Sequence, residues 1–112
     1  VIKYLSVKYF NVPCLVFDEI DSGTSGEIAS MIASMMKEVS NEVQLISISH
    51  QPQIAARADY HLKVFKSEDE NHTKSHVSIL NKNERILEIA KLLSGKTTSN
   101  EALENAKVLL SQ

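Results

Sequence analysis

The sequence predicts an α/β fold built around parallel strands. A continuous apolar run at residues 14–17 and a strand-like segment at residues 43–48, Val-Gln-Leu-Ile-Ser-Ile, are separated by an amphipathic segment of helical length, which is the order of a β–α–β unit. Such a unit makes its two strands parallel, with a right-handed crossover. Two alternating segments and two amphipathic segments follow, and they predict an antiparallel hairpin and two flanking helices.

The composition is that of one ordinary globular domain. Of 112 residues, 43% are hydrophobic and 23% are charged, which excludes wholesale disorder. The net charge of −2 argues against a chain-wide basic surface for nucleic acid or membrane. The single cysteine cannot form an internal disulfide, so a reducing cytoplasm is expected. No apolar run approaches the roughly 18 residues that span a bilayer, and no membrane partner is expected.

The first half of the chain predicts a helix, a strand and a second helix. Residues 1–10 begin in mid-pattern without an initiator Met, as the back half of an amphipathic helix in a fragment of a longer protein would. The continuous apolar run at residues 14–17 is typical of a strand buried on both faces. Thr24 and Glu27 match a capping box, and apolar residues at helical spacing follow over residues 28–39.

The rest of the chain predicts a strand, a short helix or turn, two antiparallel strands and two helices. We expect these elements at residues 43–48, 51–58, 60–65, 75–80, 83–93 and 100–110. The charged stretch of residues 66–74 is expected to be a long hairpin loop. Gly95 is expected to end the first of the two helices.

Acidic and imidazole side chains follow the two parallel strands. The first strand ends in Asp18-Glu19 and the second in a segment that carries His50, so they should meet at the ligand-binding edge of the sheet. An apolar strand ending in Asp-Glu is the Walker B pattern of nucleotide hydrolases. Asp18 would act on the magnesium shell, and Glu19 would act on the water that attacks the γ-phosphate. His50 could bind both the γ-phosphate and that water. Taken singly, these residues are also compatible with an acidic strand exit and a capped loop histidine.

Other candidate residues are interpreted as structural. Met31, Met35 and Met36 are expected to fill the core beneath their helix rather than to bind a soft metal. The remaining histidines lack the grouping of metal ligands, and His61 and His76 are expected at solvent-facing strand positions.

Two loop segments and the final helices resemble a known family. Residues 15–27, Leu-Val-Phe-Asp-Glu-Ile-Asp-Ser-Gly-Thr-Ser-Gly-Glu, resemble the Walker B and D-loop of the RecN family. That family comprises bacterial DNA repair ATPases of the structural-maintenance-of-chromosomes (SMC) type. Residues 49–55, Ser-His-Gln-Pro-Gln-Ile-Ala, resemble its H-loop, which often reads Thr-His-Leu-Pro-Gln-Val-Ala. Segments within residues 80–106 resemble its C-terminal tail. Ser49 and Gln51 are mild departures that leave the implied roles unchanged.

The resemblance implies that residues 1–112 form the C-terminal portion of an ABC-type (P-loop NTPase) head, in which ATP is sandwiched between two subunits. Asp18 would hold Mg²⁺ through water, Glu19 would polarise the attacking water, and His50 would sense the γ-phosphate. The implied D-loop would communicate across the head-to-head homodimer through Asp21, Ser22 and Gly23. The implied partners are the N-terminal half of the same head, a second head, and DNA, which the full-length protein would bind during double-strand break repair and recombination. The implied location is the nucleoid of the cytoplasm.

Several parts of such a head are missing from the sequence. It contains no Gly-x-x-x-x-Gly-Lys-Ser/Thr phosphate loop (Walker A), no Ser-Gly-Gly signature and no coiled coil. Because nothing would cradle the phosphates, we expect this chain alone neither to bind ATP tightly nor to hydrolyse it. One alternative is the equivalent segment of another SMC-like or ABC head. A second is a magnesium-dependent nuclease or topoisomerase-type domain with Asp18, Glu19 and Asp21 on the metal. A third is a non-catalytic interaction module.

Overall fold

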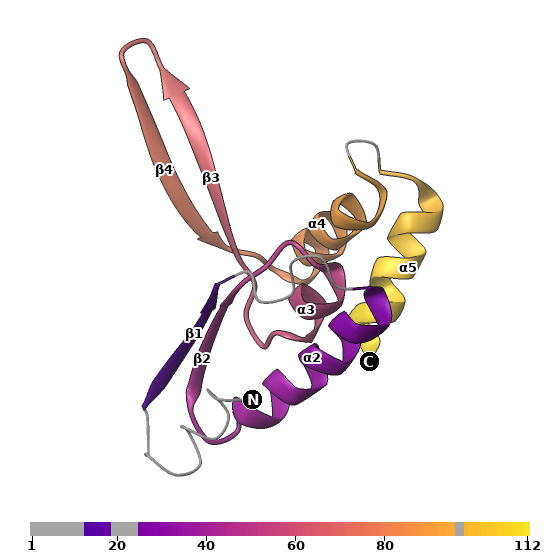
Figure 1. Cartoon of the computed structure of the whole chain (residues 1–112). Helices are drawn as coiled ribbons and strands as arrows, with labels where there is room; N and C mark the ends of the chain where they lie inside the picture. Colours follow the sequence, from indigo (N-terminus) through magenta and orange to yellow (C-terminus); the bar gives the residue numbers. More distant parts are fainter. Residues whose placement is uncertain (1–12, 19–24, 96–97) are drawn as a thin grey trace.

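The computed structural model describes residues 13–18, 25–95 and 98–112 (Figure 1). The elements are, in chain order, β1 (Cys14–Asp18), α2 (Gly26–Val39), β2 (Gln44–Ile48), α3 (Pro52–Arg57), β3 (Leu62–Asp69), β4 (His72–Ile79), α4 (Lys82–Ser94) and α5 (Asn100–Ser111). One strand pair is parallel and the other antiparallel, so the predicted α/β class is confirmed. The helix predicted for residues 1–10 lies outside the described residues.

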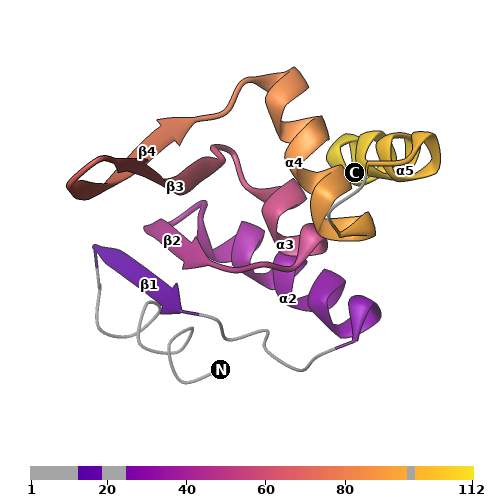
Figure 2. The same cartoon turned by 90° about the horizontal axis from the view of Figure 1, so that it is seen from above.

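The parallel pair is covered on one face. β1 and β2 pair in register from Cys14 with Gln44 to Asp18 with Ile48. Leu15 and Phe17 are buried on the face that α2 covers (Figure 2). Val16 points to the opposite face and is 48% exposed, so the prediction of a strand buried on both faces is wrong for the described chain. Because the side chains of this run are apolar on both faces, the sequence does not show that only one face of the strand is buried.

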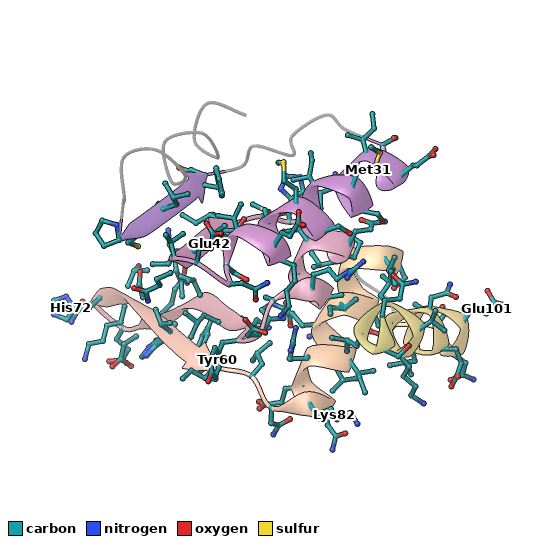
Figure 3. All side chains as sticks on the ribbon, turned by 90° about the horizontal axis from the view of Figure 1, so that it is seen from below. Met31, Glu42, Tyr60, His72, Lys82 and Glu101 are labelled. Atoms are coloured by element: carbon teal, nitrogen blue, oxygen red, sulfur yellow. The ribbon has the colours of Figure 1, made fainter. Side chains whose placement is uncertain are left out.

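α2 begins one residue later than its expected capping box. Ser25 is the N-cap, and its side chain accepts a hydrogen bond from the Ile28 amide at 3.4 Å. The predicted Thr24–Glu27 box is therefore wrong, since the neighbouring Ser25 takes the capping position. Met36 fills the core as expected, whereas Met31 is 68% exposed and points outward from α2 (Figure 3).

Two hydrophobic clusters make up the described core, and α3 contributes to both. The first joins the parallel strands to α2 and comprises Leu15, Phe17, Ala33, Met36, Val39 and Ile54. The second joins the last two helices to α3 and comprises Ala56, Ile89, Ala90, Ala102 and Ala106. Ile54 and Ala56 both belong to α3. The short helix therefore connects the strand pair to α4 and α5.

The antiparallel hairpin is longer than the sequence predicts. β3 and β4 pair from Leu62 with Ile79 to Asp69 with His72, so the expected loop at residues 66–74 is mostly strand. The two strands project together away from the helices, with His72 near the tip (Figures 1 and 3). The outer part of the hairpin, residues 66–69 and 72–74, is exposed and has only polar and charged side chains, so it has no apolar stripe to mark it as strand.

The last two helices have well-defined ends. Asn81 and Glu84 form a reciprocal capping box at the start of α4, and Gly95 ends that helix with a φ of 81°, as predicted. Ser99 caps α5 by accepting a hydrogen bond from the Ala102 amide at 3.1 Å. Lys63 of β3 donates to Glu88 of α4 at 2.8 Å, which fastens the hairpin base to the helix. None of the helices in the described part of the chain is long and apolar enough to cross a membrane.

Candidate functional site

Two predicted site residues lie at the same edge of the parallel strand pair. Asp18 is the last residue of β1 and pairs with Ile48, the last residue of β2. His50 follows Ile48 by two residues, and both Asp18 and His50 are exposed. The parallel register therefore brings a carboxylate and an imidazole to one accessible edge. Glu19, Asp21, Ser22 and Gly23 lie outside the described residues, and their roles stay predictions.

The short connection between β2 and α3 holds His50. The Ser49 Oγ accepts a hydrogen bond from the Gln51 amide at 3.0 Å, which closes a tight turn around His50. Gln51 is the N-cap of α3 without a side-chain capping bond, and the buried Pro52 begins the helix. Proline suits this first position because its ring fixes φ and it has no amide hydrogen to satisfy. His50 therefore lies in a short turn between the end of β2 and the start of α3.

The other end of α3 is held by Arg85 from α4. The Nη2 atom of Arg85 donates to the carbonyl oxygens of Ala55, Ala56 and Ala58 at 3.0, 3.3 and 2.9 Å. These are the carbonyls that a helix end leaves without intrahelical donors, and a positive charge there also favours the helix dipole. Burial lowers the pKa of Arg85, while the negative charge of Asp59 raises it in part. The guanidinium nevertheless remains charged.

His61 does not lie at the solvent-facing strand position that the sequence predicts. It lies just before β3 and is half-buried, and its buried Nδ1 atom has no hydrogen-bond partner within residues 13–18, 25–95 and 98–112. Burial lowers the pKa of His61, the charges of Arg85 and Lys63 lower it further, and Glu88 opposes them. Its burial depends on α4 packing at the hairpin base, for which the local sequence has no signal. His76 is exposed as predicted and stacks on Phe65.

The described residues fit part of a nucleotide site. A single exposed carboxylate such as Asp18 suits a water-mediated contact to Mg²⁺, which keeps several waters in its shell. No group of three or more metal-ligating side chains occurs among the residues the structure describes. Two open hollows of about 370 and 420 Å³ lie beside α4, and neither is lined by Asp18 or His50. In the described part of the chain, this edge thus presents the side chains of Asp18 and His50, and neither of the two hollows reaches them.

Sequence reasoning assigned no role to Gln53, three residues after His50. Its side chain lies against Gly26, the first residue of α2. The resemblance of residues 49–55 to an H-loop includes this glutamine, but only the packing of α3 on α2 shows what the side chain contacts.

The chain is similar to segments of curated bacterial proteins. It is 46% identical over 98 residues to DNA repair protein RecN of Rickettsia conorii, a match covering 88% of this chain and 18% of the relative. It is 43% identical over 100 residues to RecN of Deinococcus radiodurans, covering 89% and 18%. It is 36% identical over 111 residues to RecN of Bacillus subtilis, covering 99% and 19%. The chain thus spans less than a fifth of these relatives' lengths. No model of a known protein family matches it.

The fold is similar to that of a solved structure. That structure comes from work on the ATP-driven dimerization and DNA-stimulated activation of SMC ATPases. The TM-score is 0.63 at 24% identity, and the match covers 85% of this chain and 56% of the other. These matches favour the RecN resemblance over another ABC protein and over a nuclease-type domain. By sequence the chain corresponds to a segment of the RecN proteins, and its fold is similar to part of that solved structure.

Proposed function

We propose that this chain supplies the Walker B, D-loop and H-loop portion of a RecN-like ATPase that acts in the repair and recombination of DNA double-strand breaks. The observation that carries the proposal is the parallel pairing of Asp18 with Ile48, because it supports a common edge for the acidic strand end and His50. The matches to proteins named DNA repair protein RecN supply the biological setting. The proposed location is the nucleoid of the cytoplasm.

The proposed roles follow from the chemistry of each side chain. Asp18 would hold Mg²⁺ through water, and the ion would supply positive charge that neutralises the phosphates. Glu19 orients the attacking water and accepts its proton. His50 donates a hydrogen bond to the γ-phosphate, since an imidazole has one donor nitrogen even when neutral. Asp21, Ser22 and Gly23 contact the opposite subunit across the nucleotide.

The exposed apolar faces support a site that other parts of the protein complete. Val16, Ile46 and Ile48 are 43–52% exposed on the open face of the parallel pair. Four further apolar residues, Leu62, Val64, Val77 and Ile79, are 53–69% exposed on the hairpin face opposite Phe65. Covering apolar surface contributes about 25 cal/mol per Å². We propose that the N-terminal half of the same head covers these faces and supplies the phosphate-binding residues, and that two heads dimerise around ATP.

The test is ATP turnover by the full-length RecN-family protein that carries this segment. Glu19→Gln should lower kcat by about 10²- to 10⁴-fold, because it removes the general base. ATP binding should be retained, since the phosphates are held elsewhere. Glu68→Gln is the matched control, as Glu68 is an exposed carboxylate of β3. Unchanged turnover in Glu19→Gln would show that Glu19 is not the base.

A second measurement tests whether the site is incomplete. Isothermal titration of ATP into the 112-residue chain alone should detect no tight binding, because the sequence has no phosphate-binding loop. Micromolar affinity in this titration would contradict the proposal that another part of the protein grips the triphosphate.

A further inference from the structure

The side chain of Gln53 fills a space that exists because residue 26 is glycine. Gln53 is the second residue of α3, and Gly26 is the first residue of α2. A Cβ added to Gly26 would lie 3.0 Å from Nε2 of Gln53 and 3.8 Å from its Cδ. Ordinary contacts of a Cβ begin at 3.4 Å, so an alanine here would require the Gln53 amide to shift by a few tenths of an ångström. Gly26 does not have a positive φ, so the glycine provides room rather than an unusual backbone conformation.

The amide of Gln53 is held in place at a cost in stability. Its Oε1 atom is buried, and it accepts no hydrogen bond from the residues that the structure describes. A buried acceptor without a donor loses its hydration and gains nothing in return, so native structures contain few of them. A methionine of similar length and shape would fill the same space without that loss. Packing alone therefore does not explain a glutamine at this position, and such local conflicts are expected at functional positions.

The location of this contact relates it to the proposed site. Gln53 follows His50 by three residues, and the turn between them is closed by a hydrogen bond, so a shift of α3 is expected to move His50 as well. On the other side, α2 packs on β1 through the first core cluster, and β1 ends at Asp18. The far end of α3 is fastened to α2 separately, by the bond from Arg57 to the Ser34 Oγ at 3.1 Å. The Gln53–Gly26 contact thus lies closer to His50 along α3 than the Arg57–Ser34 bond does.

We propose that Gln53 is a positioning residue for ATP hydrolysis: its amide, seated against Gly26, sets the position of His50 relative to Asp18. The inference rests on the function proposed above. Gln53 acts through α3 and the turn that follows β2, and it does not contact the nucleotide.

The experiment measures kcat, the KM for ATP and stability for variants of the full-length protein. Gln53→Met should lower kcat about tenfold, because small misplacements of a catalytic group are costly, and should leave KM within about twofold. Its thermal stability should equal or exceed that of the wild type. Gly26→Ala should also lower kcat without loss of stability, since alanine favours a helix more than glycine does. Gln44→Met is the matched control, because Gln44 is exposed at the start of β2.

The double variant tests whether the two residues act through one contact. Gly26→Ala should have no further effect on kcat in the Gln53→Met background, because the amide it displaces is already gone. Wild-type kcat in Gln53→Met, or multiplicative losses in the double variant, would overturn the inference. His50→Ala separates the two proposals. If it abolishes turnover while Gln53→Met and Gly26→Ala are fully active, only the positioning role fails. If it has no effect, the proposed role of His50 fails and the positioning role fails with it.

Discussion

Ile89 should be the most sensitive position in the second hydrophobic cluster. It is 0% exposed and is the one large side chain among the described residues that is fully buried. Its buried neighbours in the cluster are four alanines, Ala56, Ala90, Ala102 and Ala106, which cannot extend to fill a space left by a smaller side chain. The packing of α4 on α5 and α3 therefore depends on this side chain.

The size of the effect of Ile89→Ala follows from the atoms removed. The substitution deletes three carbons, each worth about 0.8 kcal/mol on burial, or roughly 2.4 kcal/mol together. The unfilled cavity adds about 1 kcal/mol, which brings the expected loss to about 3 to 4 kcal/mol, within the usual range for such changes. Ile89→Val deletes one carbon and should cost about 1 kcal/mol. Leu87→Ala on the same helix is the control, because Leu87 is 48% exposed.

Native-state hydrogen exchange measures this loss without requiring the whole protein to unfold in one step. Amides of α4 and α5 should exchange at least about 10²-fold faster in Ile89→Ala, since each 1.36 kcal/mol corresponds to a factor of ten. Ile89→Val should give an increase of several-fold. If Ile89→Ala changes the exchange of these amides no more than Leu87→Ala does, the described packing of α4 on α5 is wrong.

Three further predictions concern groups around the helix ends and the hairpin base. Arg85→Met should destabilise the protein by about 1 to 2 kcal/mol in urea unfolding, because three carbonyls at the end of α3 lose a charged but partly exposed donor; no loss would exclude this capping role. The pKa of His61 is lowered in the folded state, so the unfolded chain takes up the proton more readily. Stability from His61 should be fully present above its ordinary value of 6.5 and fall as the pH drops below it; His61→Asn should flatten this dependence, and an unchanged pH profile would contradict it. Asn81→Ala should cost about 1 kcal/mol by removing the capping box of α4, whereas an unaltered melting temperature would count against that cap.

The parallel pair and the edge that Asp18 and His50 share could be predicted because they depend on local patterns. An apolar strand, an amphipathic helix and a second apolar strand determine a parallel pair through chain connectivity alone. Once β1 and β2 are parallel, Asp18 and His50 must lie at the same edge, as the register shows. The end of α4 could also be predicted from the sequence, because Gly95 adopts a positive φ that other residues avoid.

The features that the sequence could not reveal depend on contacts between distant residues. His61 is half-buried because α4 packs beside it. The sequence around His61 does not indicate that Arg85 and Glu88 of that helix lie near it. The extension of β3 to Asp69 depends on pairing with β4, since its side chains are exposed on both faces. The role of Gly26 becomes visible only where Gln53 approaches it.

The site was predictable only in part for a similar reason. Asp18 and His50 follow from two strand ends, but a triphosphate needs a cradle of amides and a lysine that this sequence does not contain. The sequence thus shows that the phosphate-binding residues are missing from this chain. It does not show the geometry of the surfaces that would complete the site.

Because α3 belongs to both hydrophobic clusters, the two halves of this protein are not expected to fold separately. Ile54 and Ala56 are two residues apart, about 200° around a helix, so they emerge on nearly opposite sides and enter different hydrophobic clusters. A cut in the connection before β3 would leave one fragment with an uncovered Ala56 and the other with Ile89 facing water. We therefore expect such fragments to be insoluble when expressed apart and to regain structure only when co-expressed.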